Sequence, residues 1–563
     1  MLRGRRNLTR KSAMAIRTLA LLSCMAGGLL AIANTLTAGD SLLGRGQSVD
    51  TVVVRPAAWA DALGPWKAYR QAQGHRIAEL DASPDAQVIR AAIGRLAAAQ
   101  TDPIRFVLLA GDVSANANLT IPACYYDSTA MSQFGGDAKL ASDNPYADLN
   151  GDDQPDLAIG RIPADSAEQL QQVLARVMAF EQQRDFSAWR RDVHVVAGVG
   201  GFGPVADSVI ELTTRRFLAD RIPGWSNLSM TQASLDSHYC PDPWRFSEAC
   251  VGRLNQGGMF WVYIGHGHVK TLDYLRAGDD WLPILTQAHV PTVDVGNRPP
   301  IAVFLACYTG AFDAVEACLA EQLMLSPSGP IAALAASRVS GPYGLAMLSD
   351  GLLSSCFDDQ VGTLGEVVLR AKQRLLQSPS VANTAAGSSP TSATPRAAQL
   401  QLIDAIASAM SPTDYDLAAE RREHVWQMNL LGDPLLRLCH PGPLSLQVAD
   451  RAAAGETLHI AGHSDVPGEL LVELVLRRDQ VRKELDSLSV DLLSQIGRDG
   501  FQQRYQAANQ RIVIQQDQPL AVAGNFNVDL TIPADLPRGR YAVRAFLAGQ
   551  ATCSAGYCEL NIR

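Results

Sequence analysis

From residue 51 onward, short apolar runs alternate with amphipathic segments. TVVVR, IRFVLLAGD, MFWVYIG and PIAVFLAC are such runs, and DAQVIRAAIGRLAAAQ repeats its apolar residues at the helical spacing. Short apolar strands separated by helices are typical of a parallel sheet that is covered on both faces. The pattern predicts an α/β region, built either as two subdomains, 51–190 and 191–440, or as one larger sheet.

The pattern of hydrophobic and polar residues changes near residue 441. LSLQVAD, ETLHIAG, GELLVELVL, GNFNVDLTIP and GRYAVRAFLAG alternate apolar with polar residues and are separated by Gly and Pro turns. Such strands predict a small antiparallel β-sandwich of the immunoglobulin-like type over 441–563. A charged segment over 478–506 predicts a helical insertion in it, and the Ser-, Thr- and Pro-rich stretch 377–396 predicts a flexible surface loop in the α/β region.

A basic leader and an apolar run, 18–33, open the chain. This arrangement predicts a signal peptide or an N-terminal anchor within residues 1–38, with a lipoprotein signal ending at Cys24 as a weaker third interpretation. The expected location is therefore outside the cytoplasm, in the periplasm, at the cell surface or in the medium. Contact with a membrane is expected only through the N-terminal anchor.

Composition excludes some classes of function. Hydrophobic residues make up 47% of the chain and charged residues 19%, which is the balance of a globular protein with sizeable cores. The net charge of −9 is spread along the chain and gives no basic patch for nucleic acid. Among the ten cysteines, Cys240 with Cys250 and Cys553 with Cys558 are near enough in sequence to bridge.

Two predicted strands end on reactive side chains. MFWVYIG leads to His266 and PIAVFLA leads to Cys307, so parallel neighbouring strands would bring the two groups to one edge of the sheet. A thiol that attacks a carbonyl and an imidazole that moves the proton are the groups of a cysteine peptidase. Gly265 and Gly267 permit a sharp turn, and the N–H of Gly267 could stabilise an oxyanion. Each residue alone would be read as a buried thiol or a loop histidine.

Several motifs together resemble those of a known protein family. YIGHG, LACYTGAFD, EQLML and GPIAALAAS, with PDLAIGRIP and NLLGDPLLRL, resemble the gingipain family of cysteine peptidases, which has a caspase-like fold. The resemblance covers about residues 51–563, and for the sandwich it is architectural only. It implies a caspase-like parallel sheet flanked by helices, followed by the β-sandwich.

The resemblance also assigns roles. It implies that Cys307 is the nucleophile and His266 the general acid/base, with the backbone N–H groups of Gly267 and Cys307 as the oxyanion hole. His268 matches no catalytic group of the family. Arginine-specific gingipains carry an acid beside the catalytic histidine and a second acid that holds arginine. The corresponding stretch here, VGGFGPVADS, lacks the first acid and offers only Asp207 or Glu211 for the second.

DLNGDDQPD has the spacing that begins a calcium loop. It supplies oxygen ligands from Asp148, Asn150, Asp152 and Asp156. The competing interpretation is an Asx-rich turn. No cofactor is expected to be required, and structural calcium is the one metal that the sequence suggests.

The leading hypothesis is an exported cysteine endopeptidase that cleaves protein or peptide substrates through Cys307 and His266. The alternative is a sorting-type transpeptidase or a non-catalytic peptidase-like binding protein that acts on exported partners. A calcium-stabilised adhesin is a third hypothesis, and it leaves the Cys–His pair unexplained.

Overall fold

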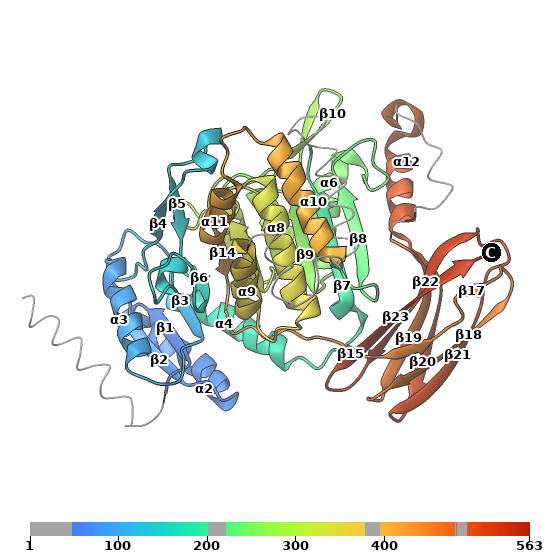
Figure 1. Ribbon diagram of the computed structural model, residues 1–563, viewed down its shortest axis with the longest axis horizontal. Coiled ribbons are helices and arrows are strands. Elements are labelled where there is room, and N and C mark those ends of the chain that lie inside the picture. The colour runs from blue at the N-terminus through green and yellow to red at the C-terminus, as the bar shows by residue number, and fades with distance from the viewer. Residues whose placement is uncertain (1–47, 201–220, 378–394, 479, 481–491) are drawn as a thin grey trace, which may run out of the picture.

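The computed structural model describes residues 48–200, 221–377, 395–478, 480 and 492–563. Within them the chain forms a helix-covered sheet followed by a strand-rich C-terminal part (Figure 1). The predicted leader, the Ser-rich stretch 378–394 and the acids Asp207 and Glu211 lie outside the described residues. Among the helices that are described, none is long and apolar enough to cross a membrane.

The α/β region is built on one ten-stranded sheet rather than on two separate sheets. Its strand order is β2-β1-β3-β6-β14-β13-β12-β9-β7-β8. The strands are β1 (Thr51–Arg55), β2 (Ile77–Asp81), β3 (Phe106–Ala110), β6 (Ala158–Ile162), β7 (Asp192–Ala197), β8 (Asn227–Gln232), β9 (Phe260–Ile264), β12 (Ile301–Leu305), β13 (Ala332–Ala336) and β14 (Met428–Leu431). The order shows that β2-β1-β3-β6 and β8-β7-β9-β12 repeat one topology, each with its second strand at the outside.

The predicted fold class is confirmed, with one difference in strand direction. The pairings within β2-β1-β3-β6 and within β8-β7-β9-β12-β13 are parallel, whereas β14 runs antiparallel to β13. Helix α11 (Leu417–Gln427) leads directly into β14, whose first residue, Met428, pairs with the last residue of β13, Ala336. The chain therefore enters the sheet at the end where β13 finishes, and β14 has to run backwards.

Both faces of this sheet are buried. On β9, Trp261 and Tyr263 belong to one core and Val262 to the other, as alternation along a strand requires. Apolar side chains of α2 (Gly64–Ala72), α4 (Ala167–Gln182), α6 (Phe246–Asn255) and α7 (Leu319–Leu325) fill the first core. The second core is covered by α8 (Pro342–Leu353), α9 (Leu364–Leu376), α10 (Pro395–Met410) and α11, which lie over the sheet in Figure 1. Helix α3 (Ala86–Ala98) covers β1 and β3, with Asp85 as its N-cap.

The C-terminal part consists of two facing sheets around a separate core. One sheet has the order β15-β23-β22-β19-β20 with β17 beside β23, and the other has the order β16-β18-β21. The strands are β15 (Gly442–Pro443), β16 (Ser445–Gln447), β17 (Arg451–Ala452), β18 (Thr457–Ser464), β19 (Gly468–Leu476), β20 (Ile512–Leu520), β21 (Gly524–Thr531), β22 (Gly539–Ala548) and β23 (Cys553–Ile562). Apolar residues of both sheets share one cluster, which makes this part a β-sandwich.

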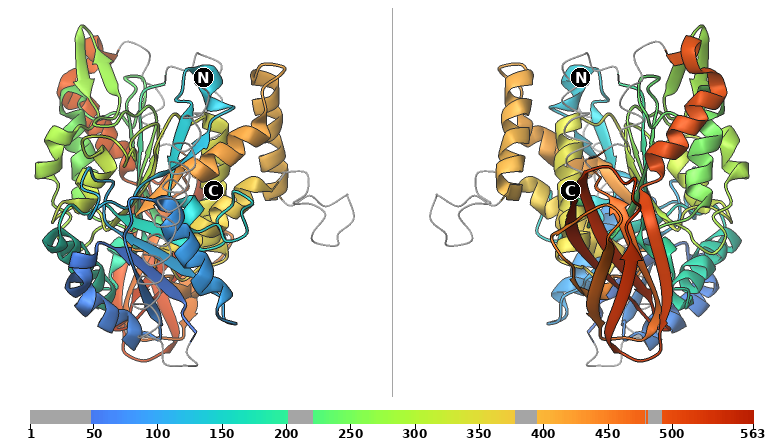
Figure 2. Two further views of the ribbon diagram at one scale, coloured as in Figure 1. Left: turned by 90° about the vertical axis from the view of Figure 1, so that its left-hand side faces the viewer. Right: turned by 90° about the vertical axis from the view of Figure 1, so that its right-hand side faces the viewer.

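The sandwich is joined to the α/β region by polar contacts. Helix α12 (Leu492–Asn509), which lies between β19 and β20, reaches back to the α/β region, where the Tyr505 hydroxyl lies 2.8 Å from that of Thr231 (Figure 2). Glu473 of β19 is buried between Arg191 and Arg544, and Arg191 Nη1 lies 2.9 Å from its Oε2. A buried carboxylate with two guanidinium partners fixes the relative position of the two parts.

The suggested disulfides are not formed. The nine described cysteines are free thiols. Cys553 and Cys558 lie on β23 at an odd separation, so their side chains point to opposite faces of the sheet. Cys240 and Cys250 are both packed in the first α/β core, where burial raises the pKa of the Cys240 thiol to about 12.

Candidate active site

The predicted Cys–His pair follows two neighbouring strands. β9 and β12 are parallel, with Ile264 opposite Leu305, and the Gly265 N–H donates to the Leu305 carbonyl at 3.3 Å. His266 and Cys307 each stand two residues beyond the end of their strand. The register of the sheet therefore delivers both residues at the same level of one edge.

Gly267 brings the two loops into direct contact. A Cβ on this residue would lie 2.7 Å from the Cys307 carbonyl oxygen and 3.0 Å from the Ala306 Cβ. Real Cβ atoms do not come so close to a backbone oxygen, so only glycine fits at this position. The segment that carries His266 thus packs against the segment that carries Cys307 without an intervening side chain.

A tyrosine hydroxyl of β9 stabilises the turn that carries His266. Gly265 has φ +156°, and the buried Tyr263 hydroxyl donates to the His266 carbonyl at 2.7 Å. His266 is half-buried, whereas His268 is exposed and only its backbone is used, with its N–H donating to the Thr271 carbonyl at 2.8 Å. The two imidazoles therefore have different surroundings.

The Cys307 thiol is half-buried beside the backbone of Ser340. The Ser340 N–H donates to Sγ at 3.3 Å. Burial raises the pKa of the Cys307 thiol, and the hydrogen bonds from the Ser340 and Cys307 amides oppose this effect only in part. Burial thus favours the neutral thiol over the thiolate at Cys307.

Two backbone amides at the site are available to a substrate oxygen. Within the described residues, the Gly267 N–H has no protein acceptor, and the Cys307 N–H has none except its own thiol. Unsatisfied amides at a strand end are the donors from which oxyanion holes are made.

The residue after Cys307 has an unusual backbone conformation. Tyr308 has φ +57°, a conformation that costs a bulky residue about 1–3 kcal/mol. Its N–H donates to the Arg338 carbonyl at 3.2 Å, and burial together with a hydrogen bond to Asp137 raises the pKa of its phenol to about 12. Arg338 is in turn held by Asp313, at 2.8 Å between Nη1 and Oδ1. Sequence reasoning missed this support, because nothing in LACYTG marks a tyrosine in the left-handed region.

Buried charged groups interact with the segment that follows Cys307. The Arg161 guanidinium carbon is 4.8 Å from the centre of the Phe312 ring, and its Nε donates to Asp143 at 2.8 Å. Burial raises the pKa of Asp112 to about 6, and burial together with the Asp112 charge raises the pKa of Glu321 to about 7. Glu321 accepts the Cys318 N–H at the start of α7, so it has a structural role.

The oxygens of the proposed calcium loop are used within the loop. Asp148 accepts the Gly151 and Asp153 N–H groups, Asn150 accepts the Asp152 N–H, and Asp156 accepts the Leu149 N–H. In the described ranges, no three acidic, histidine or cysteine side chains are grouped so that they could hold a metal. The contacts are those of an Asx-rich turn, and calcium stays a prediction.

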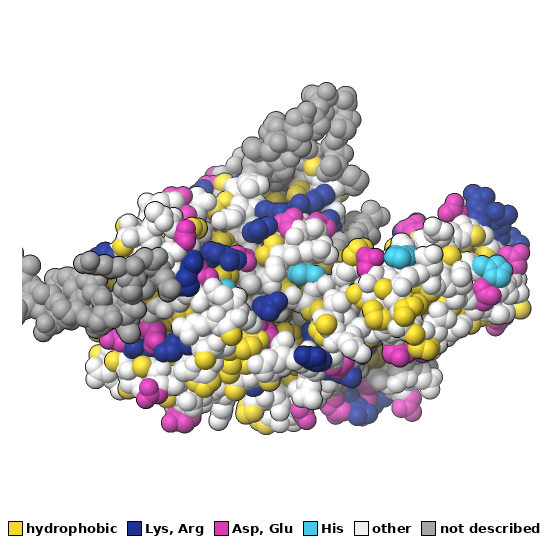
Figure 3. All heavy atoms as spheres, turned by 90° about the horizontal axis from the view of Figure 1, so that it is seen from below, with side chains coloured by type: hydrophobic (Ala, Val, Ile, Leu, Met, Phe, Trp, Pro, Cys, Tyr) yellow, Lys and Arg dark blue, Asp and Glu magenta, His cyan; other side chains and the backbone are white. Residues whose placement is uncertain are grey.

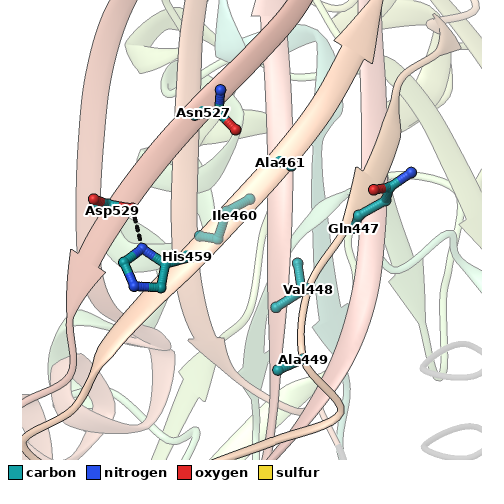
Figure 4. Close-up of a pocket in the computed structure, with 8 residues that line it drawn as sticks. All are labelled: Gln447, Val448, Ala449, His459, Ile460, Ala461, Asn527 and Asp529. Atoms are coloured by element: carbon teal, nitrogen blue, oxygen red, sulfur yellow. Dashed lines mark hydrogen bonds and ion pairs between the residues drawn. The ribbon is translucent and has the colours of Figure 1, made fainter.

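The surface also has a pocket and a face with charged side chains. The pocket in Figure 4 lies on the sandwich over β16, β18 and β21, where His459 Nδ1 lies 2.7 Å from Asp529 Oδ1, and it contains no thiol. On the face shown in Figure 3, basic and acidic side chains are interspersed.

Comparison with known proteins identifies the family. The model of peptidase family C25 matches residues 45–439, which includes both strand ends and every strand of the large sheet. The chain belongs to peptidase family C25. It is therefore a cysteine peptidase, and the resemblance to gingipains is confirmed.

Solved structures agree on the fold of this family C25 chain. It is similar to the Arg-specific cysteine proteinase gingipain R (RgpB), with 16% identity, a TM-score of 0.50, and coverage of 92% of this chain and 99% of that one. A second structure, described only as a protease, has 14% identity, a TM-score of 0.50, and coverage of 91% and 97%. The complex of RgpB pro- and mature domains from Porphyromonas gingivalis has 14% identity, a TM-score of 0.49, and coverage of 91% and 100%. No curated protein matches the chain.

Proposed function

We propose that this family C25 chain is an exported cysteine endopeptidase with Cys307 as the nucleophile and His266 as the general acid/base. The observation that carries the proposal is the contact of the two loops at Gly267, which leaves no room for a side chain between them. His266 and Cys307 follow adjacent parallel strands at the same register. Export is proposed from the basic leader and the apolar run that follows it.

Attack begins with a neutral thiol, since burial raises the pKa of Cys307. As Sγ bonds to the scissile carbonyl carbon, the thiol proton passes to His266 and the carbonyl electron pair moves to oxygen. The N–H groups of Gly267 and Cys307 are proposed to bind that oxygen. When the C–N bond breaks, His266 returns the proton to the leaving amine, and a thioester on Cys307 remains.

Water completes the cycle. His266 takes a proton from water as its oxygen attacks the thioester, and the proton restores the Cys307 thiol when the C–S bond breaks. These steps need no cofactor. A transpeptidase would use the same thioester but would admit an amine in place of water.

The test uses casein cleavage by purified protein. Cys307→Ala and His266→Ala should each lower kcat/KM by at least about 100-fold, because each removes one partner of the proton transfer. Cys124→Ala, another half-buried thiol, and His268→Ala, the neighbouring imidazole, are the matched controls and should retain activity within a few-fold.

The outcomes separate the hypotheses. Cleavage that survives Cys307→Ala would exclude Cys307 as the nucleophile. Absence of cleavage by a wild-type protein whose Cys307 is alkylated readily would favour the transpeptidase alternative or a narrow substrate. A Cys307 that neither reacts nor supports cleavage would favour the non-catalytic binding protein.

A further inference from the structure

A second pair of reactive groups lies where the α/β region meets the sandwich. Cys439 follows β14 at the end of the α/β region, and Cys553 is the first residue of β23. Their sulfurs are 3.8 Å apart, although 114 residues separate them in the chain. This is van der Waals contact, so a modest rotation of the side chains would bring the sulfurs to the ~2.05 Å of a disulfide bond.

The backbone holds the two cysteines side by side. Just after Cys439 the chain forms β15, which pairs in parallel with β23 through Gly442 opposite Ser554. The Leu444 N–H then donates to the Ala555 carbonyl at 3.0 Å. The proximity of the two thiols therefore follows from strand pairing and not from a chance choice of rotamer.

The two thiols differ in burial and in pKa. Cys553 is fully buried in a small cluster with Phe546, whereas Cys439 is half-buried against that cluster. The pKa of Cys439 is lowered because the Cys553 thiol donates a hydrogen bond to it and the positive charge of Arg190 lies nearby, and the pKa of Cys553 is raised in return. The accessible sulfur is thus the better nucleophile, and the buried one is placed to resolve a mixed disulfide.

We propose that Cys439 and Cys553 are a redox-active thiol pair that closes into a disulfide between the α/β region and the sandwich. The oxidant is an external disulfide. The Cys439 thiolate attacks one of its sulfurs and releases one thiolate, and Cys553, losing its proton, then attacks Sγ of Cys439 and releases the second. Two protein thiols are oxidised and one external disulfide is reduced to two thiols.

The closed form links the two parts of the chain covalently. Because the bond would close a loop of more than 100 residues, it removes much of the freedom of the unfolded chain. The proposal uses neither Cys307 nor His266, so it stands or falls independently of the peptidase mechanism.

Mass spectrometry of the full chain tests the pair directly. The reduced protein is incubated with oxidised glutathione, free thiols are alkylated, and the digest is analysed without reduction. The expected product is a cross-linked peptide that contains Cys439 and Cys553. The apparent unfolding temperature should rise by about 4 °C and return on reduction.

The variants sharpen the result. Cys553→Ser should leave glutathione attached to Cys439 and abolish the thermal shift, whereas Cys558→Ser, on the same strand, should behave as the wild type. Alkylation of both Cys439 and Cys553 in oxidised wild-type protein, or a stable glutathione adduct on Cys439 in the wild type, would overturn the proposal. The measurement on the wild-type protein needs no substitution. It therefore tests the proposal even if a variant fails to fold.

Discussion

The two halves of the large sheet share a topology and differ in chemistry. β2-β1-β3-β6 and β8-β7-β9-β12 have the same strand order, and in both the third strand is followed by glycine and a titratable residue. These pairs are Gly111-Asp112 after β3 and Gly265-His266 after β9. At the position two residues beyond the fourth strand, the first half has Ala164 and the second half has Cys307.

The two halves also differ in the side chains that lie at their strand ends. In the first half the edge is closed by Arg161, whose Nη1 donates to the Gly111 and Ile121 carbonyls at 3.0 and 2.9 Å and whose remaining nitrogens bind Asp143. The second half instead leaves a thiol, an imidazole and two backbone amides at the edge. The same scaffold thus supports one edge that an arginine closes and another that carries a thiol and an imidazole.

The largest expected effect is a difference in activity between alanine variants of the glycines at the two edges. Gly267→Ala should lower kcat/KM on casein by about 100-fold, because the new Cβ would force the His266 and Cys307 loops apart by an appreciable fraction of an ångström. Gly111→Ala is the matched control. Its Cβ would come closest to the flexible tip of Ile121, at 3.2 Å, and would make ordinary contacts of 3.5 Å with Ile121 Cγ1 and Pro56 Cδ, so activity should change by less than a few-fold.

Thermal unfolding of both variants accompanies these assays. Full activity in a folded Gly267→Ala protein would show that close contact of the two loops is not required. Equal losses in both variants would show that the two edges do not differ in the way proposed.

The sequence predicts some features of the two halves and not others. The apolar strands and the placement of His266 and Cys307 at strand ends follow from periodicity, and the family match bears out the fold and the cysteine peptidase. The single sheet, the reversed β14 and the left-handed Tyr308 did not follow, because each depends on tertiary pairing. The contact of Cys439 with Cys553 was also missed, since spacing along the chain favoured other cysteine pairs.

A smaller difference is expected between the alkylation rates of one thiol in each half, Cys124 and Cys307. Burial, with a contribution from Asp143, raises the pKa of Cys124 in β4 (Cys124–Asp127) to about 11, whereas the Ser340 N–H partly offsets the effect of burial at Cys307. Alkylation follows the thiolate fraction, so Cys307 should react faster than Cys124 near neutral pH. Both rates should keep rising above about pH 9, the range of an ordinary thiol.

Peptide-resolved mass spectrometry after timed alkylation measures both rates in one sample. A Cys307 rate that levels off below neutral pH would mean that the resting enzyme holds a thiolate–imidazolium pair, and the neutral-thiol mechanism would be wrong. His266→Ala then distinguishes the two, since it would abolish such a plateau.

The smallest effect concerns Asp112, the counterpart of His266 in the first half. Burial raises its pKa to about 6, above the ~3.9 of an unfolded chain, so the folded state binds its proton more tightly. The stability that this carboxyl contributes is present at low pH and is lost as the pH rises from about 4 to about 6. Asp112→Asn removes this titration, and the variant should gain on the order of 1 kcal/mol relative to wild type between those limits.

Denaturant unfolding of both proteins on each side of this window measures the gain, with the exposed Asp61→Asn as the control that should show none. Casein cleavage by Asp112→Asn should stay within a few-fold of wild type, because the proposed reaction takes no group from the first half. If the variant folds but no longer cleaves, the Asp112 carboxyl takes part in the reaction, and the edge of the first half is chemical as well as structural.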